Sequence, residues 1–336
     1  MQPLLQHGKC GNSEKSFIFR LPSGEKNSRL PGLENAMDEE NFTQKLGVLF
    51  RQGKDVATGP GDDCAVIDDG TDRLLLAAAD QLISSVHYLD GCPAACAAVK
   101  LLHRNISDIA AMGGVPTHAL VTLAVNPMNE AWLTDFHVSL AKCAETWDIS
   151  VIGGDIARLF VRGEVCSLTI LGRVERNRLC LRSGAKTGDL LYVTGTFGNA
   201  FHSGHHLTFR PRLDEARFLA GRFTRAMMDV SDGLLKDARR MALASGCALS
   251  LDPLRIPLRH GASAEGALTD GEDYELLIAV PPALSEELEK AWCFPETELH
   301  CIGSFTGGTP GRVSGLERFD LSKMKTGYDH FHEETV

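Results

Sequence analysis

The chain has 336 residues, 43% of them hydrophobic and 23% charged, a composition typical of globular proteins. Its net charge of −10 excludes nucleic acid and anionic membranes as natural partners, because both repel an acidic surface. The length exceeds what one hydrophobic core usually needs and suits two packed domains. The bulk properties therefore predict a soluble protein of two domains.

Neither a membrane span nor a secretory signal is expected. The longest apolar run, 119–125, falls far short of the roughly 20 residues that a membrane helix requires. The N-terminus lacks the apolar core of a signal peptide. The ten cysteines form no CxxC pair, so no zinc site is expected. Together these features predict a cytoplasmic protein with reduced thiols.

The predicted elements begin after an irregular N-terminal arm at 1–36, which lacks any sustained periodicity. Met37 opens a helical pattern and is a candidate for the physiological start. From residue 73 onwards, apolar runs that fit strands alternate with helical patterns. The predicted strands are 74–79, 119–125, 149–152, 165–174, 190–193, 226–229 and 276–280. The predicted helices are 94–112, 131–147, 232–244 and 283–292.

A turn-rich segment at 182–189 interrupts this alternation. We therefore predict an N-terminal domain at 37–180 and a C-terminal domain at 181–336. The fold class is α/β (α+β), with two α/β domains, each a mixed sheet covered by helices.

Acidic residues gather where the predicted strands end and in glycine-rich turns. Asp80 follows the strand that ends at Ala79, and Gly154 and Asp155 follow the strand 149–152. Further acids of this kind are Asp63, Asp108, Asp229, Asp232, Glu272 and Asp273. Ligands bind at strand ends in open α/β sheets, so these side chains are expected to converge.

Convergence of these carboxylates requires cations. Two carboxylates about 4 Å apart repel by roughly 4 kcal/mol at an effective dielectric of about 20. A set of oxygen ligands without sulfur or imidazole suits Mg²⁺ or Ca²⁺ rather than zinc. Mg²⁺ completes its shell with water and substrate phosphates, so the pattern points to nucleotide chemistry.

Each acid also has a structural explanation that remains open. Asp63 fits a turn, Asp232 fits a helix N-cap, and Asp108 has the spacing to pair with Arg104. Neither a Walker-type phosphate loop nor the protein-kinase motifs occur. The segment 195–200 could cradle a phosphate or simply form a turn. If the protein is a kinase, it must therefore bind ATP with a different scaffold.

Seven ordered segments carry a family resemblance, which runs from about Asp38 to His332. They are Gly-Pro-Gly-Asp-Asp-Cys (59–64), Asn-Ile-Ser-Asp-Ile-Ala-Ala-Met-Gly (105–113), Ile-Gly-Gly-Asp (152–155), Arg-Ser-Gly-Ala-Lys-Thr-Gly-Asp (182–189), Asp-Val-Ser-Asp-Gly-Leu (229–234), Gly-Glu-Asp-Tyr-Glu-Leu (271–276) and Gly-Tyr-Asp-His-Phe (327–331). With these segments the chain resembles the thiamine-monophosphate kinase family, within the aminoimidazole-ribonucleotide synthetase-like superfamily. The segments at 271–276 and 327–331 are the most specific to the kinase.

The resemblance implies ATP-dependent phosphorylation of thiamine monophosphate to thiamine diphosphate, by a homodimer with its active sites near the subunit interface. It places ATP and Mg²⁺ binding and dimerisation in the N-terminal domain. Several Mg²⁺ ions would be held by Asp63, Asp80, Asp108, Asp155, Asp229 and Asp232. ATP would be contacted by Gly154, Asp155, Arg182 and Ser231. The thiamine phosphate would be contacted by His87, Glu272 and Tyr328.

Two departures from the family pattern bear on the metal site. The family usually has Ser-Thr where this chain has Ala78 and Ala79, and Thr-Thr where it has Ile156 and Ala157. Because these changes remove oxygen ligands, the number of ions and the turnover rate stay open. Two alternatives therefore remain: another ATP-dependent enzyme of the superfamily, which the segment 271–276 disfavours, or a nucleotide-binding member with reduced catalysis.

Overall fold

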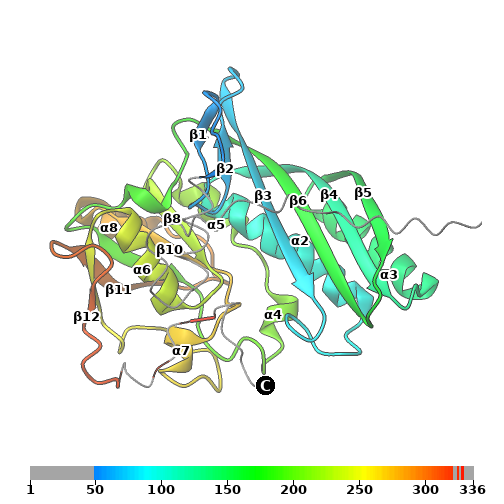
Figure 1. The fold of residues 1–336 in the computed structure, drawn as a ribbon. Coiled ribbons are helices and arrows are strands. Elements are labelled where there is room, and N and C mark those ends of the chain that lie inside the picture. The colour runs from blue at the N-terminus through cyan, green and yellow to red at the C-terminus, as the bar shows by residue number, and fades with distance from the viewer. Residues whose placement is uncertain (1–48, 321–323, 325–326, 329–336) are drawn as a thin grey trace, which may run out of the picture. The chain divides into compact units, whose positions relative to one another are not determined.

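The computed structural model describes residues 49–320, 324 and 327–328. The predicted arm at 1–36 and most of the helical pattern after Met37 lie outside these residues. The described part contains two six-stranded sheets (Figure 1). Each sheet is mainly antiparallel with one parallel pair, β4 with β5 and β9 with β12. Since helices cover both sheets, the predicted fold class is confirmed.

The first sheet has the strand order β1-β2-β3-β6-β4-β5. Its strands are β1 (Val56–Thr58), β2 (Ala65–Ile67), β3 (Arg73–Ile83), β4 (Val115–Asn126), β5 (Ser150–Arg158) and β6 (Gly163–Glu175). Along β3, β4 and β6 buried residues alternate with more exposed ones, the pattern of a sheet covered on one face. The covering helices are α2 (Ala94–Ala111) and α3 (Glu130–Thr146) (Figure 1).

Strand β5 forms one edge of this sheet, and all nine of its residues are exposed. The prediction that Gly153, Gly154 and Asp155 follow this strand is wrong, because they lie within it. Glycine is usually unfavourable inside a strand, but β4 approaches closely here. A Cβ atom at Gly154 would lie 1.7 Å from the carbonyl oxygen of Val121.

The second sheet has the order β12-β9-β11-β7-β10-β8. Its strands are β7 (Leu190–Thr194), β8 (Ala226–Val230), β9 (Ala248–Leu251), β10 (Glu275–Val280), β11 (Leu299–Thr306) and β12 (Val313–Ser314). The remaining helices are η1 (Arg182–Gly184), α4 (His205–Thr208), α5 (Leu213–Leu219), α6 (Leu234–Ala244), α7 (Gly266–Thr269) and α8 (Pro282–Ala291). Every residue of β8 and β10 is buried, so these strands are covered on both faces. This explains why they read as continuous apolar runs in the sequence.

Helix α2 joins the two halves of the described chain. It packs on β3 and β6 of the first sheet, on α3, and on α5 and β8 of the second half. Twelve of its eighteen residues are buried, as expected for a helix surrounded by protein. A polar residue on α2 can therefore meet residues of both sheets. None of the helices described has the length and apolar character needed to cross a membrane.

Candidate active site

Three of the predicted metal ligands meet where α2 lies between the sheets. Asp63 comes from the turn between β1 and β2, Asp108 from α2, and Asp229 from β8. One carboxylate oxygen of each lies within 4.8 Å of the others. Three segments that lie far apart in the sequence thus contribute to one cluster. The sequence had suggested this convergence from the position of the aspartates in turns and beside apolar runs.

The cluster holds three carboxylates, and only Asp63 among them forms an ion pair with a described cation. Asp63 Oδ2 is buried and accepts no hydrogen bond from the described residues. Burial, reinforced by Asp80, Asp229 and Asp63, raises the pKa of Asp108 well above its usual value. Burial and Asp63 likewise raise the pKa of Asp229, although its Oδ2 accepts a hydrogen bond from Ser107 Oγ at 2.6 Å. A divalent cation would offset this repulsion, and the oxygen-only donor set fits Mg²⁺.

Arg182 borders the cluster from η1. Its Nη2 donates to Asp63 Oδ1 at 2.5 Å, and its backbone N–H donates to Asp62 Oδ2 at 3.1 Å. The Nε of Arg182 is buried and has no hydrogen-bond partner among the described residues. Burial and the neighbouring Asp63 raise the pKa of Asp62 to about 7. Arg182 thus fixes one oxygen of Asp63 and leaves the other available to a cation.

The alternative role of Asp232 as a helix N-cap does not occur, because Gly233 is the N-cap of α6. The turn after β8 is held instead by Asp237, whose Oδ2 accepts the backbone N–H groups of Ser231 and Asp232 at 3.1 and 3.0 Å. Arg240 bonds to both carboxylates, at 2.6 Å to Asp232 and 2.9 Å to Asp237. Burial raises the pKa of Asp232, but Arg240 and Lys236 outweigh it and leave that pKa below its usual value. Asp232 is therefore already paired with cationic side chains.

Asp80 lies inside β3, three residues before its end, so the prediction that it follows the strand is wrong. Arg104 of α2 donates to both of its oxygens, from Nε at 2.9 Å and from Nη2 at 3.3 Å. The proposed pairing of Arg104 with Asp108 does not occur, since Arg104 turns toward β3 instead. Asp80 is also absent from the group of carboxylates that meet around Asp63.

The predicted substrate residues His87 and Glu272 are linked through Lys100 of α2. The side chain of Lys100 is fully buried, and its Nζ donates to His87 O at 2.6 Å and to Glu272 Oε1 at 2.5 Å. Glu272 has a φ of 67°, in the left-handed region that non-glycine residues rarely adopt. Its backbone N–H donates to Ser231 O at 2.7 Å, so the turn carrying Glu272 lies against the turn after β8.

Tyr328 lies against the same turn. Its backbone N–H donates to Asp232 O at 2.9 Å, and its carbonyl oxygen accepts from Lys236 Nζ. The predicted residues Ser231, Asp232, Glu272 and Tyr328 therefore gather around one turn, while Asp63, Asp108 and Asp229 form the neighbouring cluster. His87 joins the first group through its carbonyl oxygen and Lys100.

Gly154 and Asp155 are not brought to this cluster within one chain. The strand order places β5 three strands away from β3, which corresponds to roughly 14 Å. Asp155 instead lies on the exposed edge strand β5, where it is paired in register with Thr122 of β4. Among the described residues, Asp155 is therefore not part of the carboxylate group around Asp63.

Two other features do not add to the site. The segment 195–200 is a structural turn, because the N–H of Gly198 donates to Asp273 Oδ1 at 3.1 Å and its carbonyl oxygen accepts from Arg259.

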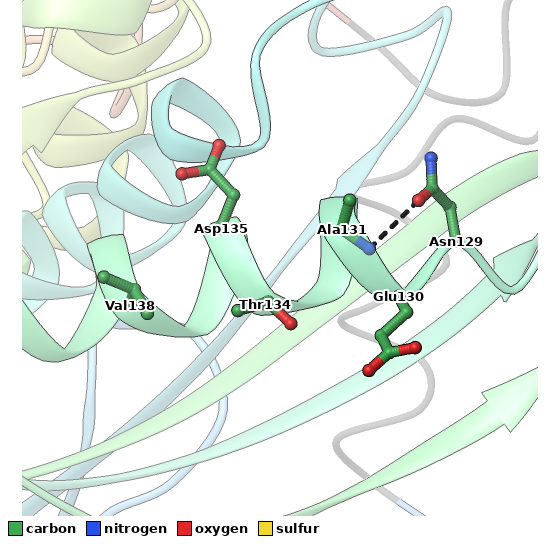
Figure 2. Close-up of a pocket in the computed structure, with 6 residues that line it drawn as sticks. All are labelled: Asn129, Glu130, Ala131, Thr134, Asp135 and Val138. Atoms are coloured by element: carbon green, nitrogen blue, oxygen red, sulfur yellow. Dashed lines mark hydrogen bonds between the residues drawn. The ribbon is translucent and has the colours of Figure 1, made fainter.

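Figure 2 shows an open surface hollow along the start of α3, where Asn129 caps the helix by accepting the N–H of Ala131. None of the predicted site residues lines this hollow.

The chain is similar to known proteins over most of its length. Residues 61–174 match the AIR synthase related protein, N-terminal domain, and residues 186–314 match the corresponding C-terminal domain. The chain is 33% identical over 305 residues to the thiamine-monophosphate kinase of Salmonella typhimurium, covering 82% of this chain and 93% of that protein. It is also 33% identical over 308 residues to the thiamine-monophosphate kinase of Rhodopirellula baltica, covering 85% and 94%.

Solved structures give the same relationship. AaThiL complexed with AMPPCP and TMP superposes with a TM-score of 0.73 at 25% identity, over 87% of this chain and 97% of that one. The thiamine-monophosphate kinase of Stenotrophomonas maltophilia K279a superposes with a TM-score of 0.67 at 28% identity, over 81% and 94%. The sequence identity, the shared domains and the nearly complete coverage of these relatives place the chain in the thiamine-monophosphate kinase family.

Proposed function

We propose that this protein transfers the γ-phosphoryl group of ATP to thiamine monophosphate in a Mg²⁺-dependent reaction. The observation that carries the proposal is the carboxylate cluster of Asp63, Asp108 and Asp229, with its buried, unpaired oxygen at Asp63. Family membership supplies the substrates, since a relative of this fold is complexed with AMPPCP and TMP. The nine described cysteines are all free thiols, which supports the predicted cytoplasmic location.

The three carboxylates would hold the metal, and the residues around them would orient ATP. Mg²⁺ bound there would neutralise phosphate charge and align the reacting oxygens. Asp63 is fixed for this role by Arg182, whose buried Nε has no hydrogen-bond partner among the described residues. Ser231 follows Asp229 by two residues and would contact the nucleotide. No general base is assigned, because a phosphate acceptor with a second pKa of about 6 is already ionised.

Glu272, His87 and Tyr328 would bind the thiamine monophosphate. The carboxylate of Glu272 is 20% exposed, so it can meet a cationic ligand while it remains paired with Lys100. Tyr328 offers an aromatic ring of the kind that binds cationic groups. Because the turn of Glu272 lies against the turn of Ser231, the acceptor would enter beside the nucleotide site.

Replacing Lys100 by methionine is expected to raise the KM for thiamine monophosphate at least about tenfold, the effect of losing a charged hydrogen bond. The KM for ATP should change little, because Lys100 contacts Glu272 and His87 and none of the proposed metal ligands. Lys290→Met, which removes an exposed cation on α8, is the matched control. Equal effects on both KM values would indicate only a general loss of structure.

The pH dependence of this contact gives a second readout. Burial lowers the pKa of Lys100 to about 8, with Glu272 opposing and Arg104 assisting the shift. The ion pair with Glu272 is therefore complete below pH 8 and is lost as the pH rises through that value. In the unmodified protein the KM for thiamine monophosphate should rise above pH 8, and Lys100→Met should abolish that rise. A parallel pH profile in both proteins would contradict the role.

A second copy of the chain would complete the site. The outer edge of strand β5 pairs with no other described strand, and its exposed side chains include the apolar Val151, Ile152 and Ile156, which suits burial between subunits. Asp155 and Gly154 on this edge would then reach the nucleotide bound by the partner. This accounts for their separation from Asp63 within one chain, and it supports the predicted homodimer.

The direct test is to incubate the protein with ATP, Mg²⁺ and either thiamine monophosphate or free thiamine, and to separate the products by chromatography. Thiamine diphosphate should form from the monophosphate alone, because free thiamine lacks the phosphate oxygen that attacks ATP. Comparable turnover of free thiamine would contradict the acceptor. Binding of ATP without any product from either compound would favour a nucleotide-binding member with reduced catalysis.

A further inference from the structure

The contact between Arg104 and Asp80 differs from the other contacts around the metal cluster. The guanidinium engages both oxygens of the carboxylate, at 2.9 and 3.3 Å, and its Nη1 also donates to the carbonyl oxygen of Gln81 at 2.8 Å. Three nitrogens of one side chain are therefore fixed against a single stretch of β3. This fork geometry is the arrangement in which arginine binds carboxylates most strongly.

The position of Arg104 on α2 places its charge beside the proposed metal site. Arg104 precedes Asp108 by four residues, so the two side chains lie one turn apart on the same face of the helix. Asp80 and Arg104 are both close enough to change the pKa of Asp108: beside the larger effect of burial, the charge of Asp80 raises this pKa and the charge of Arg104 lowers it. The Arg104–Asp80 pair therefore borders the cluster directly.

Asp80 also lacks the surroundings of a metal ligand. The preceding residues on β3, Ala78 and Ala79, offer no side-chain oxygen. Asp63 keeps one buried oxygen that accepts no hydrogen bond from any described residue, whereas both oxygens of Asp80 are engaged by the guanidinium. The side chain of Arg104 is only 13% exposed and cannot lose its proton. Moving Asp80 onto a divalent ion would leave this buried cation without a carboxylate partner, and two cations would repel each other at close range.

We propose that Arg104 serves as a permanent cation at Asp80, in the place where the aspartate would otherwise bind a divalent ion. On this proposal, which rests on the proposed Mg²⁺ cluster, the six predicted aspartates do not act alike. Asp63, Asp108 and Asp229 bind metal, while Asp80 positions a guanidinium that adds fixed positive charge beside the phosphates. Asp80 is thus the positioning residue, and the charge of Arg104 lets this chain work with fewer bound ions.

The test counts bound ions rather than turnover, so it is independent of the reaction proposed above. Mn²⁺ binding to the full chain is titrated and the free ion measured by electron paramagnetic resonance. Asp80→Asn should bind as many ions as the unmodified protein, with dissociation constants within about threefold, a change of about 0.65 kcal/mol or less. Asp63→Asn, the matched control within the cluster, should bind at least one ion fewer.

Changes at Arg104 give the converse result. Arg104→Met frees the carboxylate of Asp80, so this variant should bind one additional Mn²⁺, and combining it with Asp80→Asn should remove that ion again. Arg104→Lys keeps the charge and should leave the count unchanged. Loss of an ion in Asp80→Asn, or no added ion in a folded Arg104→Met protein, would overturn the proposal. If Arg104→Met does not fold, the count for Asp80→Asn decides alone.

Discussion

Asp229→Asn is expected to lower kcat/KM at least about a hundredfold, the scale observed when a group that stabilises transition-state charge is removed. Asp229 is buried at the end of β8 and belongs to the cluster with Asp63 and Asp108. The amide keeps the size of the side chain and can still accept the hydrogen bond from Ser107. It removes the charge that would hold Mg²⁺, so the Mg²⁺ concentration required for half-maximal rate should rise.

The same variant should not destabilise the protein in the absence of Mg²⁺. Burial and Asp63 hold the pKa of Asp229 well above its usual value, so the folded chain binds this proton more tightly than the unfolded chain does. Ionisation of Asp229 therefore costs stability as the pH rises above the unfolded pKa of about 3.9 and up to the raised folded pKa. Asparagine carries no such cost. In chelator, the melting temperature of Asp229→Asn should exceed that of the unmodified protein increasingly from pH 5 to pH 8.

Asp135→Asn is the matched control, because Asp135 is an exposed carboxylate on α3, outside the proposed site. It should leave both the rate and the melting temperature unchanged. Near-normal kcat/KM for Asp229→Asn at limiting Mg²⁺ would show that Asp229 is not a metal ligand. The proposed cluster would then fail as the origin of catalysis.

The sequence predicted the long elements because their patterns were strong. The predicted helix 94–112 agrees closely with α2, whose small and apolar residues fit a helix packed on all sides. The predicted strand 226–229 corresponds to β8, which is buried on both faces and reads as a continuous apolar run. The short strands β1, β2 and β12 span only two or three residues and depend on their partners, so the sequence offered no periodicity by which to find them.

The candidate site was predicted unevenly for a related reason. Motifs pointed to the carboxylates, because aspartates beside glycines are conspicuous in a sequence. They gave no signal for Lys100 and Arg240, and they suggested Asp108 as the partner of Arg104, which instead pairs with Asp80 on another element. The two basic residues of α2 were hidden within an apolar helix. A buried basic residue in such a helix is the signal that could have located them, because it requires a buried partner.

Arg212 illustrates another contact that no local pattern reveals. It directly precedes α5, and its Nε and Nη2 donate to the two oxygens of Glu275 on β10, at 2.7 and 2.6 Å. Thr194 of β7 donates a third hydrogen bond to the same carboxylate at 2.7 Å. The side chain of Glu275 is 2% exposed, so its charge depends on these partners for the solvation that water would otherwise provide. Gly195 is required beside it, because a Cβ atom there would lie 2.1 Å from Glu275 Oε1.

Arg212→Met is therefore expected to lower the free energy of unfolding by about 3–5 kcal/mol, since it leaves a buried carboxylate without its cation. For a chain of this size that loss corresponds to a decrease in melting temperature of about 4–7 °C, measured by circular dichroism. Adding Glu275→Gln removes the stranded charge while Thr194 keeps an acceptor, so the double variant should recover at least half of the loss. Arg255→Met, which breaks an ion pair exposed by 63% and 50% at its two side chains, should cost less than about 1 kcal/mol. If the double variant is no more stable than Arg212→Met alone, the packing of the arginine stem, and not the charge of Glu275, accounts for the loss.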